Sequence, residues 1–230
     1  MNDEIPKIIN YCWFGGNEKP EIVKKCINSW KKYCPSYKIV EWNENNFDIT
    51  INSYVQEAYY KKRYAFVSDF ARLWVIYNNG GIYLDTDVEL IRNIDELTKY
   101  DAFFSSEDNI NINTGLGFGS KKKNELLKLL MDDYDNIKFI KEDGSIDKTT
   151  CTIRNTKIIR KYLKDEKVVF DKKIVYNNMC FLPKEYFCPL DYETKKMKKT
   201  NNTYAIHWFS GTWMTKIEKF KKVIKRMLRM

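Results

Sequence analysis

The hydrophobic pattern of the first third of the chain alternates between short apolar runs and longer stretches with apolar side chains at steps of three and four residues. The short runs predict buried strands, and the longer stretches predict amphipathic helices. The predicted elements in chain order are a strand at 7–13, a helix at 21–33, a strand at 37–42, a helix at 64–78 and a strand at 82–84. This alternation indicates an α/β fold with a mainly parallel central sheet flanked by helices.

The second half of the chain continues the pattern with weaker periodicity. The segment NTGLGFGS, at 113–120, is rich in glycine, which suits a strand close to another backbone or to a ligand. The further predicted elements are a strand at 101–108, helices at 122–134 and 151–163, and short strands at 167–170 and 181–190. Because no repeat, linker or low-complexity tract interrupts the sequence, we expect residues 1–214 to form a single domain.

Residues 215–230 carry a different pattern. Their apolar side chains gather on one face of a predicted helix, and seven Lys and Arg residues surround them with a single Glu. A basic amphipathic helix of this kind is typical of binding to an anionic membrane surface. The alternative is a C-terminal helix that docks on the core and exposes its lysines. No stretch of the sequence approaches the roughly 20 apolar residues of a membrane span.

Composition limits the class of protein. The chain has 230 residues, of which 43% are hydrophobic and 31% charged, as expected of a soluble globular domain with a sizeable core. The formal net charge of +9 favours anionic partners such as nucleotide phosphates, nucleic acid or an acidic membrane. Much of this positive charge also fits a general lysine-rich bias of the composition, because most lysines are scattered along the chain.

Cysteine and histidine usage bears on metal sites and on the compartment. The six cysteines include no CxxC pair and the chain has one histidine, so a zinc finger is not expected. The N-terminal residues MNDEIPKIIN lack the basic and apolar regions of a secretory signal. We therefore expect free thiols in a cytoplasmic protein, which the basic C-terminal helix would hold peripherally on the inner face of the cell membrane.

The stretch GGIYLDTDVEL, at 80–90, places two acids at the end of a predicted buried strand. Side chains two residues apart on a strand point to the same face, so Tyr83, Asp85 and Asp87 are expected to lie together. Two adjacent carboxylates repel one another unless a cation lies between them, and Mg²⁺ or Mn²⁺ commonly bridges such carboxylates to substrate phosphates. The alternative is a pair of solvated acids at a strand end.

The helix before this strand carries Ser68, Asp69 and Arg72 on one polar face. This face interrupts an otherwise apolar helix. A surface ion pair of Asp69 and Arg72 would explain it and would contribute little to stability. The other interpretation is a polar patch that reaches a nucleotide beside the metal.

Taken together, SDFARLWVIYNNGGIYLDTDV resembles the signature of the DXD-containing sugar transferases, glycosyltransferase family 32, and the related core of the glucosylating bacterial toxins. The start IPKIINYCWFGG resembles the family's first strand, which ends in Trp-x-Gly. The resemblance implies a GT-A-type nucleotide-diphospho-sugar transferase fold. It also implies a metal-dependent retaining transfer of a sugar from a nucleotide sugar to a glycan or a lipid-linked saccharide during cell-surface polysaccharide synthesis. A UDP-sugar is the expected donor, with GDP-mannose as the alternative, and Mn²⁺ or Mg²⁺ is the expected ion.

The resemblance also implies roles for individual residues. Asp85, Asp87 and Arg72 would be the catalytic residues, with Asp87 on the metal and Asp85 bridging the metal and the ribose. The other residues expected at the donor nucleotide-sugar are Trp13 stacking on the base, Asn45 lining the site, Ser68 and Asp69 at the ribose and the sugar, and Tyr83 supporting the nucleotide. A Trp at a strand end is equally often a core residue, and both interpretations of Trp13 stay open.

The segment YAIHWFSGTW, at 204–213, contains the single histidine, His207. Family members carry a His followed by a Ser-Trp-like pair near the end, and here the pair is Thr212-Trp213. The resemblance implies that His207 contacts the metal or the diphosphate and that Trp213 covers the diphosphate, with Ser210 and Thr212 as alternative contacts. The other interpretation of His207 is a structural histidine.

Similar transferases place an Asn and small residues near the acceptor, which points to Asn113, Thr114 and Gly115. Glu107 and Asp108 precede them and are further candidates. The alternative is a close-packed strand, and the segment lacks the GK[ST] ending of a phosphate loop.

Two other classes of function remain open from the sequence. One is a basic nucleic-acid-binding protein, for which no recognition motif is present, so we expect no nucleic-acid partner. The other is an inactive sugar-nucleotide-binding module, which the intact acids argue against.

Overall fold

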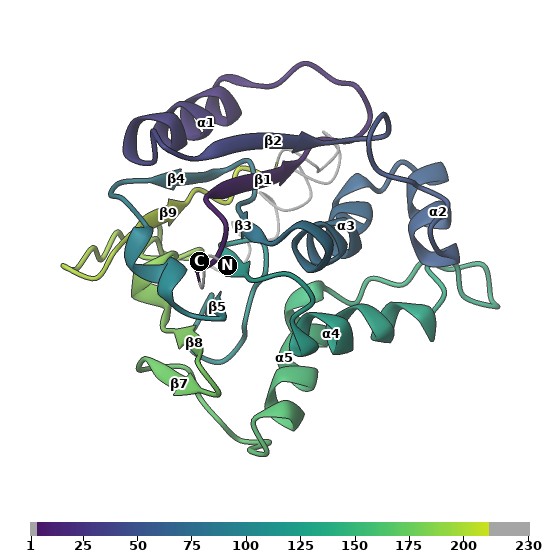
Figure 1. Cartoon of the computed structure of the whole chain (residues 1–230). Coiled ribbons are helices and arrows are strands. Elements are labelled where there is room, and N and C mark those ends of the chain that lie inside the picture. The colour runs from purple at the N-terminus through teal and green to yellow at the C-terminus, as the bar shows by residue number, and fades with distance from the viewer. Residues whose placement is uncertain (1–3, 212–230) are drawn as a thin grey trace.

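The computed structural model describes residues 4–211 (Figure 1). Thr212, Trp213 and the predicted helix at 215–230 lie outside the described residues. The central sheet has seven strands in the order β2-β1-β3-β6-β5-β8-β7. Their bounds are β1 (Ile8–Cys12), β2 (Lys38–Trp42), β3 (Gly81–Tyr83), β5 (Ala102–Ser105), β6 (Phe118–Ser120), β7 (Ile174–Tyr176) and β8 (Met179–Leu182).

The sheet is mostly parallel, as predicted. Strand β1 pairs in parallel with β2 and with β3, and β5 pairs in parallel with β8. Strands β6 and β7 run antiparallel to their neighbours. The carboxyl ends of β1, β3 and β5 therefore lie at one edge of the sheet, beside the start of β6.

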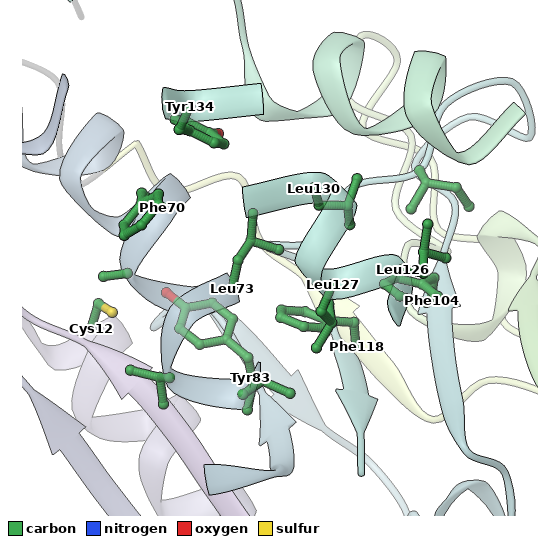
Figure 2. Packing of buried hydrophobic residues seen from close by; sticks show 14 of the residues in the cluster. Cys12, Phe70, Leu73, Tyr83, Phe104, Phe118, Leu126, Leu127, Leu130 and Tyr134 are labelled. Atoms are coloured by element: carbon green, nitrogen blue, oxygen red, sulfur yellow. The ribbon is translucent and has the colours of Figure 1, made fainter. Parts of the chain in front are cut away.

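Helices cover both faces of the sheet (Figure 1). Their bounds are α1 (Glu21–Tyr33), α2 (Ser53–Tyr60), α3 (Tyr64–Asn79), α4 (Glu125–Asp135) and α5 (Cys151–Tyr162). Successive side chains of β3 point to opposite faces of the sheet and pack in two different hydrophobic clusters. Ile82 packs in a cluster with Trp30 of α1, whereas Tyr83 packs in the cluster formed with α3 and α4. Figure 2 shows Tyr83 and Phe118 of the sheet packed with Leu73 of α3 and Leu127 of α4.

The junction between α3 and β3 depends on two glycines. Gly80 and Gly81 have φ of 67° and 102°, in the region that residues with a Cβ rarely adopt. A Cβ on Gly81 would also lie 2.7 Å from the carbonyl oxygen of Ile8. The glycines therefore let the chain leave a buried helix and pair at once with β1.

Some predicted elements differ from the structure. The strand predicted at 82–84 spans Gly81–Tyr83, and Asp85 and Asp87 lie in the turn that follows it (residues 85–87, the DXD turn), where Val88 N donates to the carbonyl of Asp85 (3.0 Å). The predicted strand at 167–170 is absent from this part of the described chain, and the strands form at β7 and β8 instead. Helix α2 was not predicted, because its run of eight residues is too short for a clear period.

A second, two-stranded sheet brings the C-terminal segment to the DXD turn. Strand β4 (Val88–Leu90) pairs antiparallel with β9 (Ala205–His207), and Val88 lies opposite His207. Trp208 N donates to the carbonyl of Asp87 (3.0 Å) and extends this ladder into the turn. Within residues 4–211, no helix has the length and apolar character needed to span a membrane.

Candidate active site

The carboxyl edge of the sheet opens into a cavity of about 630 Å³. Strand β1 has β2 on one side and β3 on the other, and such a reversal of strand order is where open α/β sheets bind ligands. The chemically distinctive residues that line the cavity are Trp13, Asp69, Arg72, Asp85, Asp87 and His207. They come from β1, α3, the DXD turn and β9, so segments far apart in the sequence share one site.

Arg72 is the centre of the first group of contacts. Its Nη2 lies 3.2 Å from Oδ1 of Asp69 and 3.2 Å from Oδ1 of Asp85. Its guanidinium carbon lies 5.0 Å from the centre of the Tyr83 ring, and the Tyr83 hydroxyl donates to Oδ1 of Asp85 (3.0 Å). The Asp69–Arg72 pair is therefore buried against the DXD turn, and it is not the surface ion pair that the sequence left open.

The two carboxylates that flank Arg72 are buried to different degrees, with the side chain of Asp69 12% exposed and that of Asp85 30% exposed. Burial raises the pKa of Asp69 to about 6, although the charge of Arg72 opposes this shift. Burial also raises the pKa of Asp85; Arg72 opposes that shift and the nearby Asp87 carboxylate adds to it. Carboxylates that are costly to ionise are typical of functional sites, where a ligand supplies the missing compensation.

Asp87 is the centre of the second group of contacts. Its Oδ1 lies 3.2 Å from Nε2 of His207, and its Oδ2 accepts hydrogen bonds from the Ser210 backbone N–H (2.8 Å) and hydroxyl (2.9 Å). Burial raises the pKa of Asp87, but His207 and Ser210 outweigh it and hold this pKa at about 2. Burial likewise lowers the pKa of His207, and the Asp87 carboxylate outweighs it and raises this pKa to about 10. The two side chains form an ion pair over the whole neutral range.

The donor atoms fit a hard divalent cation. Asp85 and Asp87 offer carboxylate oxygens to one cavity, and His207 offers an imidazole nitrogen beside them. Within residues 4–211, no three His, Cys, Asp or Glu side chains already converge on a single position. That arrangement suits an ion whose coordination is completed by substrate phosphates and water, as Mg²⁺ sites usually are.

Trp13, which follows β1 directly, also lines the cavity. Its indole N–H donates to the carbonyl of Asn17 (2.7 Å), which fixes the ring plane at the end of β1. Ser68 also lines the cavity, but its hydroxyl donates to the carbonyl of Tyr64 (3.0 Å) within α3. Asn45 is exposed and does not line the cavity; its neighbour Glu44 accepts from Gly15 N (3.0 Å) instead.

The three residues predicted near the acceptor occupy different positions. Asn113 lines the cavity, and its Oδ1 accepts from Gly115 N (2.7 Å). Thr114 is fully buried, and its hydroxyl accepts from Asn155 Nδ2 (3.1 Å). Gly115 supports the DXD turn, because its carbonyl accepts from Asp85 N (2.9 Å) and a Cβ there would lie 2.1 Å from Asp85 Oδ2.

Several cavity residues were not identified from the sequence. Tyr64 packs its ring against Gly15, whose φ is 90°, and Cys151 at the start of α5 places its Sγ 3.6 Å from Arg72 Nη1. Phe209 packs its ring against His207, tilted by 50° with 4.1 Å between ring centres, and has a φ of 51°, which is unusual for a bulky residue. None of these residues carries a periodic or motif signal that sequence reasoning could use.

Comparison with known proteins agrees with this geometry. Residues 20–104 match the sequence model of the family described as the glycosyltransferase sugar-binding region containing the DXD motif. That region contains α3, the Gly80-Gly81 junction and the DXD turn. Residues 20–104 of this protein therefore form a DXD-type glycosyltransferase region.

Two curated relatives support the assignment. The glycosyltransferase domain is 24% identical over 220 residues to an uncharacterised glycosyltransferase of Acanthamoeba polyphaga mimivirus, covering 91% of this chain and 84% of that protein. It is 33% identical over 111 residues to the inositol phosphoceramide mannosyltransferase 3 of Schizosaccharomyces pombe, covering 43% of this chain but only 29% of the relative. The chain is therefore a glycosyltransferase.

The fold also has a solved counterpart. The structure of the PaToxG glycosyltransferase matches with a TM-score of 0.53 and 19% identity, over 70% of each chain. This likeness confirms the predicted GT-A fold of the glycosyltransferase. The family match begins at residue 20 and ends at residue 104, so Trp13 and His207 lie outside it and are placed at the site by the strands β1 and β9.

Proposed function

We propose that this glycosyltransferase performs a metal-dependent, retaining transfer of a hexose from a nucleotide sugar to a glycan or a lipid-linked saccharide in cell-surface polysaccharide synthesis. The observation that carries the proposal is the pairing of the two DXD carboxylates with different partners in one cavity. Asp85 is held by Arg72 of α3 and Asp87 by His207 of β9. An aromatic side chain, Trp13, lines the same cavity.

The donor would lie along the edge of the sheet from β1 to β3. The base stacks on Trp13, an interaction worth about 1–3 kcal/mol. Asp69 and Arg72 receive the hydroxyl groups of the ribose and the sugar, because one side chain accepts and the other donates hydrogen bonds. Ser68 and Tyr83 lie at the same wall and support the nucleotide.

Asp85 and Asp87 would hold Mn²⁺ or Mg²⁺ together with the donor diphosphate, and His207 would join them as a neutral imidazole once its proton beside Asp87 is displaced by the ion. A divalent ion bound there would neutralise the negative charge that develops on the diphosphate as the sugar leaves. Arg72 adds a fixed positive charge on the same side, since it stays protonated under all conditions. Asp85, Asp87 and Arg72 are therefore the residues on which catalysis is expected to depend.

The donor is expected to be a UDP-sugar, because the sequence resembles a family whose members often use UDP-sugars and stacking on Trp13 suits uracil. The name of the fission-yeast relative, a mannosyltransferase, gives GDP-mannose specific support as the second candidate. The same name includes a ceramide lipid, which supports a lipid-linked acceptor for this chain. Asn113 is the described residue best placed to meet that acceptor, while Gly115 supports Asp85 and Asn45 stays outside the cavity.

We further propose that residues 1–214 form one catalytic domain and that the basic helix at 215–230 holds it on anionic lipid at the cytoplasmic face of the membrane. The cytoplasmic leaflet is negatively charged and attracts such basic segments. Flotation with phosphatidylserine vesicles should recover the full chain and lose the chain truncated after residue 211. Equal recovery of both would contradict the membrane role without touching the catalytic proposal.

Turnover measurements test the catalytic proposal directly. The full chain is incubated with UDP-glucose, UDP-galactose, UDP-N-acetylglucosamine and GDP-mannose, and release of UDP or GDP is measured with Mn²⁺ or with EDTA. We expect release from one donor that depends on the metal and falls at least about 100-fold in Asp87→Ala. Nucleotide binding without any release would favour the inactive module. The absence of both binding and release would favour the nucleic-acid-binding alternative.

A further inference from the structure

Glu107 lies in the cavity on the far side of Asp85 from Trp13. Strands meet the carboxyl edge of the sheet in the order β1, β3, β6, β5, and Trp13, Asp85 and Glu107 follow β1, β3 and β5 respectively. All three residues line the same cavity. With the base on Trp13 and the diphosphate at the DXD turn, Glu107 therefore faces the end where the sugar and its acceptor meet.

Glu107 is held rigidly with respect to the DXD turn. One of its carboxylate oxygens, Oε2, accepts a hydrogen bond from Asn113 Nδ2. Asn113 Oδ1 in turn accepts from Gly115 N (2.7 Å), and the carbonyl of Gly115 accepts from Asp85 N (2.9 Å). Three consecutive hydrogen bonds therefore fix the position of Glu107 relative to Asp85, which is the precision that a reacting group needs.

The carboxylate also keeps capacity for a ligand. Within residues 4–211, no Lys, Arg or His side chain forms an ion pair with Glu107, and no described group donates to its second oxygen, Oε1. The other acids that line the cavity, Asp69, Asp85 and Asp87, are each paired with a cation. Glu107 is thus the cavity carboxylate that has no cationic partner within residues 4–211.

We propose that Glu107 binds the attacking hydroxyl group of the acceptor and takes its proton; this inference rests on the proposed function. The acceptor oxygen forms a bond to the anomeric carbon of the donor sugar on the same face that the diphosphate leaves, which retains the anomeric configuration. The bond from that carbon to the diphosphate oxygen breaks, and its electron pair leaves with the diphosphate. The hydroxyl proton passes to the Glu107 carboxylate. With water as the acceptor, the same step hydrolyses the donor.

The test compares Glu107→Gln with Asp108→Asn in the full chain, using water as the acceptor and the donor selected by the turnover panel. Glutamine keeps an oxygen that accepts from Asn113, so a purely structural role is preserved while the base is lost. Asp108→Asn makes the same change of charge at the next residue. Asp108 is exposed and outside the cavity, and its Oδ1 accepts from the backbone of Ile110 and Asn111, which an Asn oxygen can also do.

We expect Glu107→Gln to slow Mn²⁺-dependent hydrolysis by at least about 100-fold, the lower end for loss of a general base, with UDP or GDP affinity within twofold of the wild type. Asp108→Asn should match the wild type in both measurements. Hydrolysis by Glu107→Gln within threefold of Asp108→Asn would overturn the assignment. A wild type that binds nucleotide sugars without hydrolysing them, or that binds none, would refute the proposed function instead.

Discussion

Replacing Gly115 by alanine places a methyl group where the Asp85 carboxylate now lies. The added Cβ would be 2.1 Å from Asp85 Oδ2, and Cβ atoms essentially never approach a neighbour closer than 3.0 Å. Either the carboxylate moves by about 1 Å or the backbone of Gly115 moves and loses its hydrogen bond to Asp85 N. Gly115 itself has no positive φ, so the change acts through this contact alone.

The magnitude follows from the contacts of Asp85. Its Oδ1 accepts from the Tyr83 hydroxyl at 3.0 Å and lies 3.2 Å from Arg72 Nη2, and a shift of about 1 Å breaks at least one of them. Overpacking of this kind destabilises by about 1–3 kcal/mol, which lowers Tm by roughly 2–4 °C per kcal/mol in a domain of this size. A misplacement of about 1 Å in a reacting group lowers turnover by about 100-fold.

Differential scanning fluorimetry and metal-dependent release of UDP or GDP measure the two effects on one preparation. Gly144→Ala is the matched control, because Gly144 has a φ of 77° but no neighbour within 4 Å of an added Cβ. It should lower stability by about 1–2 kcal/mol through backbone strain and leave turnover unchanged. A Gly115→Ala variant with the Tm and turnover of the wild type would refute the proposed support of Asp85 by this glycine.

Two further changes test the ends of the donor site. Trp13→Ala should weaken UDP or GDP binding by roughly 5- to 150-fold in isothermal titration, as expected for the loss of about 1–3 kcal/mol of stacking. Trp13→Phe should retain most of the nucleotide affinity. Equal affinity of the wild type and both variants would place the base elsewhere. Asp69→Asn should be more thermostable than the wild type at pH 8 but not at pH 4. The pKa of Asp69 is raised to about 6 in the folded protein, so protonated Asp69 contributes its full stability below pH 4. The wild type loses this contribution as the pH rises through 6. A Tm difference that is the same at both pH values would contradict the buried setting assigned to Asp69.

Much of the fold could be predicted because its pattern is local. Helix α1 spans the predicted residues 21–33, and α3 ends at the predicted glycines, since one apolar stripe and two breakers define each helix. The strand predicted at 82–84 ends one residue earlier, at Tyr83, because the apolar run gives no signal of where pairing ends. In the structure Asp85 N bonds to the Gly115 carbonyl, and the chain turns there into β4.

Part of the site could be predicted because its residues share one motif, and Trp13 and His207 were indicated by their resemblance to residues of the family. Asp69, Arg72, Asp85 and Asp87 lie within nineteen residues of one another, and the structure brings them together as the motif indicated. The place of His207 depends on the pairing of β4 with β9, which joins residues more than a hundred apart. Long-range pairing of this kind leaves no local signal in the sequence. No local signal places Tyr64 and Cys151 in the cavity either.

The central claim is that the cavity binds a nucleotide sugar together with a divalent metal. The most direct test is a thermal-shift titration of the full chain with UDP-sugars and GDP-mannose, with and without Mn²⁺. At a ligand concentration of 100 times Kd, binding should stabilise the protein by about 2.7 kcal/mol, which corresponds to roughly 5–10 °C for a domain of this size. We predict such a shift for one donor with Mn²⁺ and little shift with EDTA. A shift that is independent of the metal, or no shift with any donor, would contradict the claim.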